Sequence, residues 1–267
     1  MHTLKSAALV ALLAASASVV RAQTFAYTPG MAKYRITQKM SQTQEMMGQK
    51  KTDSLSSVQL LSLDLAAKGK DSLAFTLTID STTTSMAPAQ AELAKLNGKK
   101  VTGAMSSLGK VASFVAPVDS ASPTKGQEFE SLRNFMLRFP DRNPKVGTSW
   151  VDTTNTPINN QGITGHATII ITSKIVGDTT VAGQKAWRVQ RTGTTAVSGA
   201  GTQNGQALVL EGKGTLNGMS YVGANGVYLG ANSTQNQEMS IQLPAMGMTV
   251  PITQTVSTMV EMVGPKK

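Results

Sequence analysis

The most constraining feature of the sequence is an alternation of apolar and polar residues between positions 61 and 79. Large apolar side chains occupy every second position on both sides of a turn-forming run at residues 67–71. These side chains are Leu61, Leu63, Leu65, Leu73, Phe75, Leu77 and Ile79. Successive side chains of a strand point to opposite faces, so the pattern predicts a hairpin with one buried and one solvated face.

Segments with weaker strand patterns follow along most of the chain. They are residues 33–43, 99–105, 110–115, 163–176, 186–197, 207–216, 219–222, 227–233, 238–243 and 252–262. Asn225 and Gly226 favour a tight hairpin, and the run at residues 169–171, all isoleucine, predicts a strand covered on both faces. No low-complexity linker divides the chain, so we expect residues 23–267 to form a single, mainly β domain. Its antiparallel curved sheet would be a half-barrel or a sandwich.

One segment departs from the β pattern and predicts a central amphipathic helix that covers the sheet. Its large apolar residues recur at helical spacing between positions 129 and 139. They are Phe129, Leu132, Phe135, Met136 and Phe139, with Phe135 at the edge of the face. Pro140 disfavours helical geometry at the residue before it, and a strand is expected to begin near Trp150. Residues 87–96 predict a second, short helix.

Residues 1–22 have the features of a secretory signal peptide. Lys5 precedes an apolar run at residues 7–20, and small residues precede a cleavage position before Gln23. A membrane anchor is the alternative, although the run is shorter than the roughly 20 residues that a spanning helix needs. Export to the periplasm or the extracellular space is therefore expected, with no transmembrane segment in the mature chain.

The composition excludes several classes of site. The chain has no cysteine, so it has no disulfide framework and no thiolate metal site. Removal of Lys5 and Arg21 with the leader would lower the formal net charge from +10 to about +8. A looser basic group, Arg133, Arg138, Arg142 and Lys145, is either a solvated surface or a contact for an anionic envelope surface. Nucleic acid is not expected as a partner, because export and few aromatic residues argue against it.

No catalytic or cofactor motif stands out. His166 is the one histidine after the leader, and the sequence contains neither a Gly-x-Ser-x-Gly elbow nor a His-Glu-x-x-His cluster. We therefore predict a non-enzymatic binding or envelope-structural protein without metal or cofactor. The alternative is a hydrolase with an unrecognised carboxylate or serine site. An outer-membrane barrel is a further alternative, but the chain is only 4% aromatic and such barrels carry aromatic girdles.

The large apolar residues of the helix segment allow two interpretations. They plug a solid core, or they line a cavity for a lipid or another amphiphile. The candidate ligand-binding residues are Phe129, Leu132, Phe135, Met136, Phe139 and Trp150. The two interpretations differ in what truncation of these side chains would cost.

Several short segments carry a resemblance to known proteins. They are Phe139-Pro140, residues 145–150 (Lys-Val-Gly-Thr-Ser-Trp) and the late run Gly212-Lys213-Gly214. Together with the leader and the long strands, they resemble an uncharacterised family of secreted bacterial β-rich proteins. More distantly the chain resembles the LolA, LolB and LppX half-barrel carriers, which implies a curved sheet cupped over helices and a hydrophobic cargo. Unlike the lipoprotein members, this chain has no cysteine after the leader.

Overall fold

The computed structural model describes residues 25–46, 48–117, 129–133, 135–160, 162–203, 205–223 and 226–264. The predicted signal peptide, residues 1–22, lies outside these ranges. The elements in chain order are β1 (Gly30–Met46), β2 (Gln49–Gly69), β3 (Ser72–Thr84), α1 (Ala87–Ala94), β4 (Lys100–Ser106), β5 (Val111–Val115), α2 (Glu130–Arg133), β6 (Ser149–Asn160), β7 (Ile163–Val181), β8 (Gln184–Gln203), β9 (Gln206–Gly223), β10 (Tyr228–Leu243), the 3-10 turn η2 (Pro244–Met246) and β11 (Met248–Gly264).

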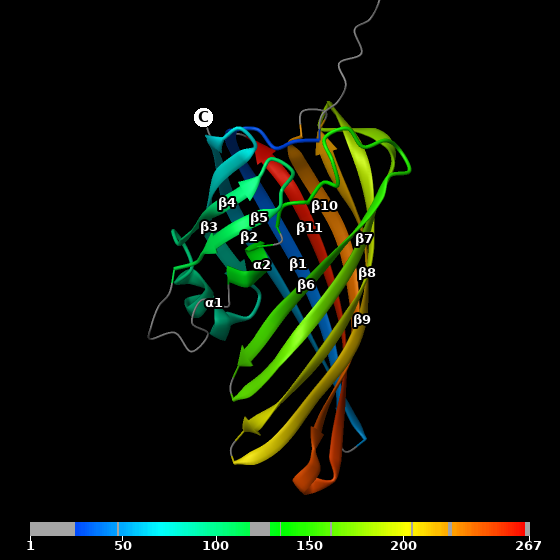
Figure 1. The fold of residues 1–267 in the computed structure, drawn as a ribbon. Helices are drawn as coiled ribbons and strands as arrows, with labels where there is room; N and C mark the ends of the chain where they lie inside the picture. The colour runs from blue at the N-terminus through cyan, green and yellow to red at the C-terminus, as the bar shows by residue number, and fades with distance from the viewer. Residues whose placement is uncertain are drawn as a thin grey trace, which may run out of the picture.

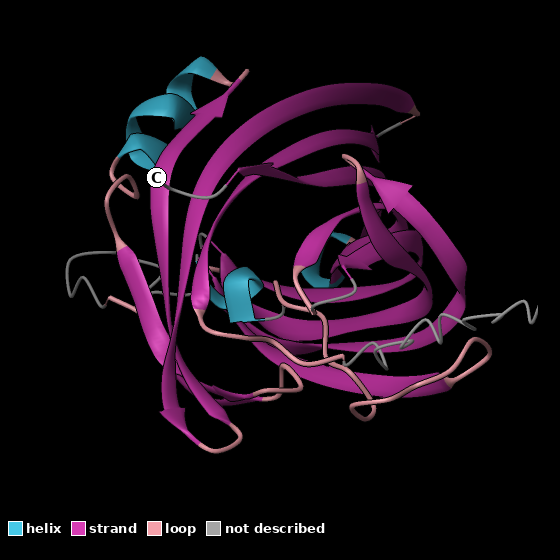
Figure 2. Ribbon diagram, turned by 90° about the horizontal axis from the view of Figure 1, so that it is seen from above, coloured by secondary structure: helices cyan, strands magenta, loops and turns pink. Residues whose placement is uncertain are grey.

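All the described strands belong to one antiparallel sheet, which confirms the predicted mainly β fold and favours a half-barrel over a sandwich. The strand order is β5-β4-β3-β2-β1-β11-β10-β9-β8-β7-β6 (Figure 1). The chain builds β1 to β5 outward to one edge, starts again at the opposite edge with β6, and returns to pair β11 with β1. Seen from above, the sheet curls around α2 without closing, and α1 lies outside the curl (Figure 2).

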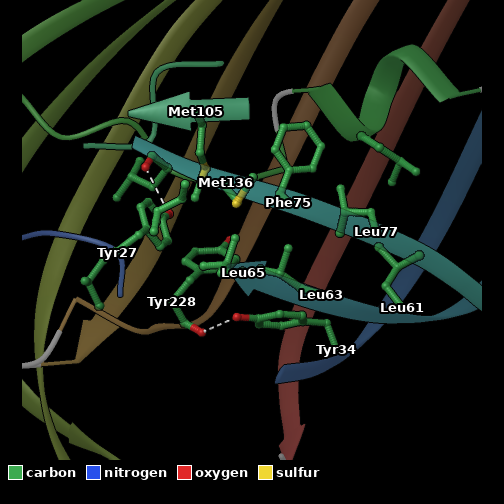
Figure 3. Close-up of a cluster of buried hydrophobic side chains, with 14 of the residues drawn as sticks. Tyr27, Tyr34, Leu61, Leu63, Leu65, Phe75, Leu77, Met105, Met136 and Tyr228 are labelled. Carbon is green, nitrogen blue, oxygen red and sulfur yellow. Dashed lines mark hydrogen bonds between the residues drawn. The ribbon is translucent and has the colours of Figure 1, made fainter. Parts of the chain in front are cut away.

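The predicted hairpin at residues 61–79 is confirmed and forms one side of the core. Leu61 pairs with Ile79, and Leu63 pairs with Leu77, so these side chains share one face of the sheet. The face that bears this core is called the inner wall, and the opposite face is called the outer wall. Figure 3 shows the core around Tyr34, whose hydroxyl donates a hydrogen bond to the carbonyl oxygen of Tyr228 at 2.9 Å.

Glycines on the inner wall explain how the sheet curls so tightly at β7, β8 and β9. They are Gly165, Gly193, Gly199, Gly201, Gly212, Gly214 and Gly218. A Cβ at Gly193 would lie 2.6 Å from the Ile170 carbonyl oxygen, and one at Gly218 would lie 2.5 Å from the Asn232 carbonyl oxygen. Only residues without a side chain allow backbones to approach this closely on the inside of a bend.

The segment that follows α2 spans the upper opening of the curled sheet. The Phe139 N–H donates to the Leu108 carbonyl oxygen at 2.8 Å, and the Gly147 N–H donates to the Ile175 carbonyl oxygen at 2.8 Å. The Phe139 ring is 1% exposed and packs edge-on to Phe25, with ring centroids 5.3 Å apart. This segment therefore links the β4–β5 hairpin to β7 and covers the core from above.

The structure corrects the extent of the predicted central helix. Only residues 130–133 form α2, and residues 135–139 are not helical. The Phe139 N–H is bonded to Leu108 on another hairpin, so tertiary packing determines the backbone where helical spacing suggested a continuous helix. The second predicted helix is confirmed as α1, with a proline in its first turn and no buried residue.

Three strand predictions were also wrong. The separate segments 207–216 and 219–222 are one strand, because Asn217 and Gly218 pair with Thr234 and Ser233 inside the β9–β10 ladder. The separate segments 227–233 and 238–243 likewise belong to one strand, β10, whose residues 234–237 pair with both β9 and β11. The isoleucine run in β7 is not covered on both faces, since Ile170 points to the outer wall and is 43% exposed. Its neighbours there are polar, and the strand has one solvated face.

Candidate functional site

Three neighbouring strands bring polar side chains together on the inner wall, directly below the core. Trp150 of β6 pairs with Ser173 of β7, and Ser173 pairs with Arg191 of β8, so the three side chains lie side by side on one face. Two further residues lie on the same wall. Trp187 is on β8, above Arg191, and Ser220 is on the neighbouring strand β9. We call these five residues the donor cluster.

Each residue of the donor cluster has a buried polar atom without a hydrogen-bond partner in the described chain. The atoms are Trp150 Nε1, Ser173 Oγ, Trp187 Nε1, Arg191 Nε and Ser220 Oγ. Ser173 is 1% exposed and Ser220 is 0% exposed. Indole and guanidinium nitrogens donate and do not accept hydrogen bonds. Buried polar groups are nearly always satisfied, so such a group of unpaired donors calls for an acceptor supplied from elsewhere.

The charge of Arg191 is also unbalanced. It forms no ion pair among the residues that the structure describes. Asp152 lies on the adjacent register row of the inner wall, but Arg138 binds its Oδ1 at 2.9 Å. A half-buried cation without a counter-charge is costly, because the interior screens and solvates it less than water does.

Arg191 also influences two buried tyrosines. Burial raises the pKa of Tyr228 to about 12, and the positive charge of Arg191 and the nearby Ser220 hydroxyl partly offset this rise. The Ser220 hydroxyl approaches Tyr228 without the geometry of a hydrogen bond. Burial also raises the pKa of Tyr27, again opposed by Arg191. The guanidinium therefore acts on the underside of the aromatic core.

Below the donor cluster, the inner wall carries a row of apolar side chains across five strands. These are Ile171, Leu216, Val256, Met40 and Leu55, aligned through Gly193 and Gln235. All five side chains are only partly buried. The inner wall thus presents donors at one level and partly exposed apolar groups at the next.

The predicted ligand-binding residues occupy two environments. Phe129, Leu132, Met136 and Phe139 are 1% to 6% exposed and belong to the core. Phe135 is partly buried, with its ring 5.0 Å from Tyr34 and 5.8 Å from Tyr228. Trp150 packs against the same core and contributes its indole N–H to the donor cluster.

The predicted basic group is spread along the upper part of the molecule. Arg133 stacks over the Phe114 ring at 4.5 Å, and Arg138 binds Asp152. Arg142 forms an ion pair with Asp71. Lys145 is exposed. A contact of these residues with an anionic surface stays a prediction.

Of the donor cluster, only Trp150 was among the residues predicted from the sequence. A signal was present in β8, where Arg191 follows Trp187 and Val189 at every second position. A charged residue in phase with apolar residues lies on the buried face of a strand. Such a placement is uncommon and marks a candidate site. Ser173 and Ser220 could not be found in this way, because serine is common on either face.

The hollows described on the surface lie along the outer wall. One of about 550 Å³ spans β8 to β11 and includes Lys213 and Glu238, and another of about 400 Å³ includes Lys39 and Asn217. Their linings combine hydroxyl, amide and charged residues with Met259 and contain no aromatic ring.

His166 also lies on the outer wall, beside a serine. Ser198 Oγ is 3.4 Å from His166 Nε2 and 3.5 Å from Nδ1, and both residues are on neighbouring strands. Within the described ranges, no group of three or more His, Asp or Glu residues could hold a metal ion. No helix in those ranges has the length and apolarity needed to cross a membrane.

No family model and no curated protein matches the sequence. Among solved structures, the OmpT loop L8 deletion mutant, an outer membrane protein of Vibrio cholerae, is 8% identical with a TM-score of 0.25, covering 88% of this chain and 100% of that one. The COG4313 outer membrane channel from Pseudomonas putida F1 is 8% identical with a TM-score of 0.16, over 89% and 97% of the two chains. A DUF1329 family protein from Desulfovibrio piger ATCC 29098 is 9% identical with a TM-score of 0.15, over 88% of each chain.

These likenesses are too slight to transfer a function. They do not show the expected likeness to the LolA, LolB and LppX carriers. The prediction that the chain is not an enzyme is withdrawn. The likeness to the OmpT structures neither excludes catalysis nor establishes an activity.

Proposed function

We propose that the chain is an exported envelope protein that binds an amphiphile along the inner wall of its curled sheet. The observation that supports this function is the pairing of unsatisfied donors with partly exposed apolar side chains on one continuous wall. An amphiphile has a polar group that can accept hydrogen bonds from the donors and an apolar chain that can pack on the apolar side chains. A purely apolar ligand would leave the donors unpaired at a cost.

The predicted ligand-binding residues form the upper end of this proposed site. Four of them belong to the core and hold in place the segment that covers it, namely Phe129, Leu132, Met136 and Phe139. In this proposal Phe135 and Trp150, at the lower side of the core, contact the ligand. In this proposal residues 23–267 act as one unit after removal of residues 1–22. The protein then works in the periplasm or outside the cell.

The two tryptophans of the chain, Trp150 and Trp187, provide an internal reporter of binding. Both lie on the inner wall, so a fatty acid brominated at mid-chain should quench their emission in a saturable manner. Native mass spectrometry of protein recovered from the periplasm should also show a bound amphiphile. Trp150→Phe and Trp187→Phe would show which indole lies nearer to the bromine atoms.

A matched control uses Ile171 and Ile170, which are neighbours on opposite walls of β7. Ile171→Asn should weaken binding, because it places an amide in the apolar row, whereas Ile170→Asn should leave the affinity unchanged. Absence of quenching, together with ligand-free mass spectra, would contradict the proposed function.

A second candidate function follows from the contact between Ser198 and His166 on the outer wall. If this pair performs ester hydrolysis, Ser198→Ala and His166→Ala should each lower the rate by about three or more powers of ten. Turnover of p-nitrophenyl acetate and labelling by a fluorophosphonate would test it. Equal rates for the wild type and both variants would exclude it.

A further inference from the structure

We infer that the ligand carries an anionic head group and that Arg191 binds it. This inference rests on the proposed function and specifies its ligand class. The head group is a carboxylate or a phosphate at one end of an alkyl chain. It would lie beside Arg191, Trp150 and Ser173, which are cross-strand neighbours on the inner wall.

The donor cluster matches an anion better than a neutral polar group. Three of its unpaired atoms, Trp150 Nε1, Trp187 Nε1 and Arg191 Nε, can only donate hydrogen bonds. Carboxylate and phosphate oxygens only accept them when ionised, and the planar guanidinium can bind two such oxygens together. A neutral alcohol would present its own donor and supply no charge.

The surroundings leave the charge of Arg191 available. Asp152, the carboxylate on the next row of the wall, is already bound by Arg138 at 2.9 Å. On the other side, Arg191 pairs in register with Gly218, which has no side chain to occupy it. Among the described residues, therefore, no acidic side chain serves as the counter-ion of Arg191.

The direction of the alkyl chain follows from the rows of the wall. Above Arg191, Val189 and Ile175 are 0% exposed and belong to the core. Below it, Ile171, Leu216 and Val256 are only partly buried. The chain therefore extends downward from the head group, along the apolar row and away from the core.

The test compares dodecanoate, dodecyl phosphate and dodecanol, each below its aggregation threshold and at about 0.15 M salt. Tryptophan emission and calorimetry would give the Kd of each ligand for the wild type, Arg191→Gln and Arg188→Gln. Arg188 is the matched control, because it lies on the same strand but on the exposed outer wall. Arg191→Lys is a second variant that keeps the charge and loses the planar fork, and it replaces Arg191→Gln if that variant does not fold.

The wild type should bind at least one of the two anions about 10- to 100-fold more tightly than dodecanol. Arg191→Gln should remove this preference by weakening the binding of the anions far more than that of dodecanol. Arg191→Lys should retain part of the preference, and Arg188→Gln should retain all of it. The tighter anion would tell a fatty acid from a phosphate-bearing lipid.

Two results would count against the inference in different ways. Equal affinity for all three ligands, or a preference that survives in both Arg191 variants, would overturn the head-group assignment and leave amphiphile binding intact. No binding of any of the three would overturn the proposed function as well.

Discussion

Truncation of Phe139 tests whether the segment above the sheet is a solid part of the core. Its ring is 1% exposed and lies 5.3 Å from the Phe25 ring and 5.2 Å from the Tyr27 ring. Truncation of a buried phenylalanine to alanine costs about 3 to 5 kcal/mol in lost burial and residual cavity. Two aromatic pairs would be lost in addition, so Phe139→Ala should fall at the upper end of this range.

A loss of about 4 to 5 kcal/mol corresponds to a fall in Tm of roughly 8 to 20 °C for a chain of this size. Urea denaturation followed by tryptophan emission would measure the free energy of unfolding. Phe139→Leu keeps most of the volume but removes both ring pairs, so its loss should be clearly smaller. Val146→Ala, in the same segment and at a side chain that is 56% exposed, is the control and should change little.

A loss below about 1 kcal/mol for Phe139→Ala would refute this reasoning. Such a value would mean that the ring lines an empty space or that the segment is not held against the core. The interpretation of Phe129, Leu132 and Met136 as core residues would then fail with it. The cavity alternative for the helix segment would be favoured instead.

Two further predictions concern the buried tyrosines and the curl of the sheet. Burial raises the pKa of Tyr228 to about 12 and also raises that of Tyr34, against about 10 in an unfolded chain, so the folded state keeps these hydroxyls neutral. The contribution of these tyrosines to stability should therefore be fully present below pH 10 and fall between about pH 10 and 12, by about 1.4 kcal/mol per pH unit for each tyrosine that stays neutral. Urea denaturation at several alkaline pH values would measure this fall, and a flat profile between pH 10 and 12 would contradict it. Gly193→Ala should destabilise by about 1 to 3 kcal/mol, because its Cβ would meet the Ile170 carbonyl oxygen. Gly69→Ala has open space and should be neutral, so equal Tm values for the two variants would argue against the role of inner-wall glycines.

The sequence predicted the parts of the fold in which side-chain polarity has a clear period. The large apolar residues from Leu61 to Ile79 alternate with Ser, Thr, Asp or Ala, and the hairpin follows from that alternation. The first part of β2, residues 49–60, was not predicted as a strand. There, Thr43 and Thr52 pair on the outer wall while glutamine and leucine share the inner wall, so neither face is uniformly apolar. Those residues stay extended because the two strands pair in a hairpin, and not because one face of the strand is apolar and buried.

The helix prediction failed for a different reason. Phe129 and Phe139 are both buried, as helical spacing suggested, but contacts with distant parts of the chain determine their positions. Tyr27 and Phe25 pack on Phe139 from more than a hundred positions away. Such contacts leave no local pattern. Arg191, by contrast, could have been found from its phase with Val189, because an inward charge is visible in a strand register.

The strand order has a consequence for how the chain could be rearranged. Among the described strands, β1 and β11 are the one adjacent pair that is not consecutive in sequence, and Lys33 is paired with Gly264 near the two ends of the sheet segment. A circular permutant that joins β11 to β1 by a short linker and opens between β5 and β6 would run through the sheet as one uninterrupted meander. Its contact order would be lower, because the pairing across the full chain length becomes a local one. Faster folding is expected for such a permutant, with the native sheet unchanged.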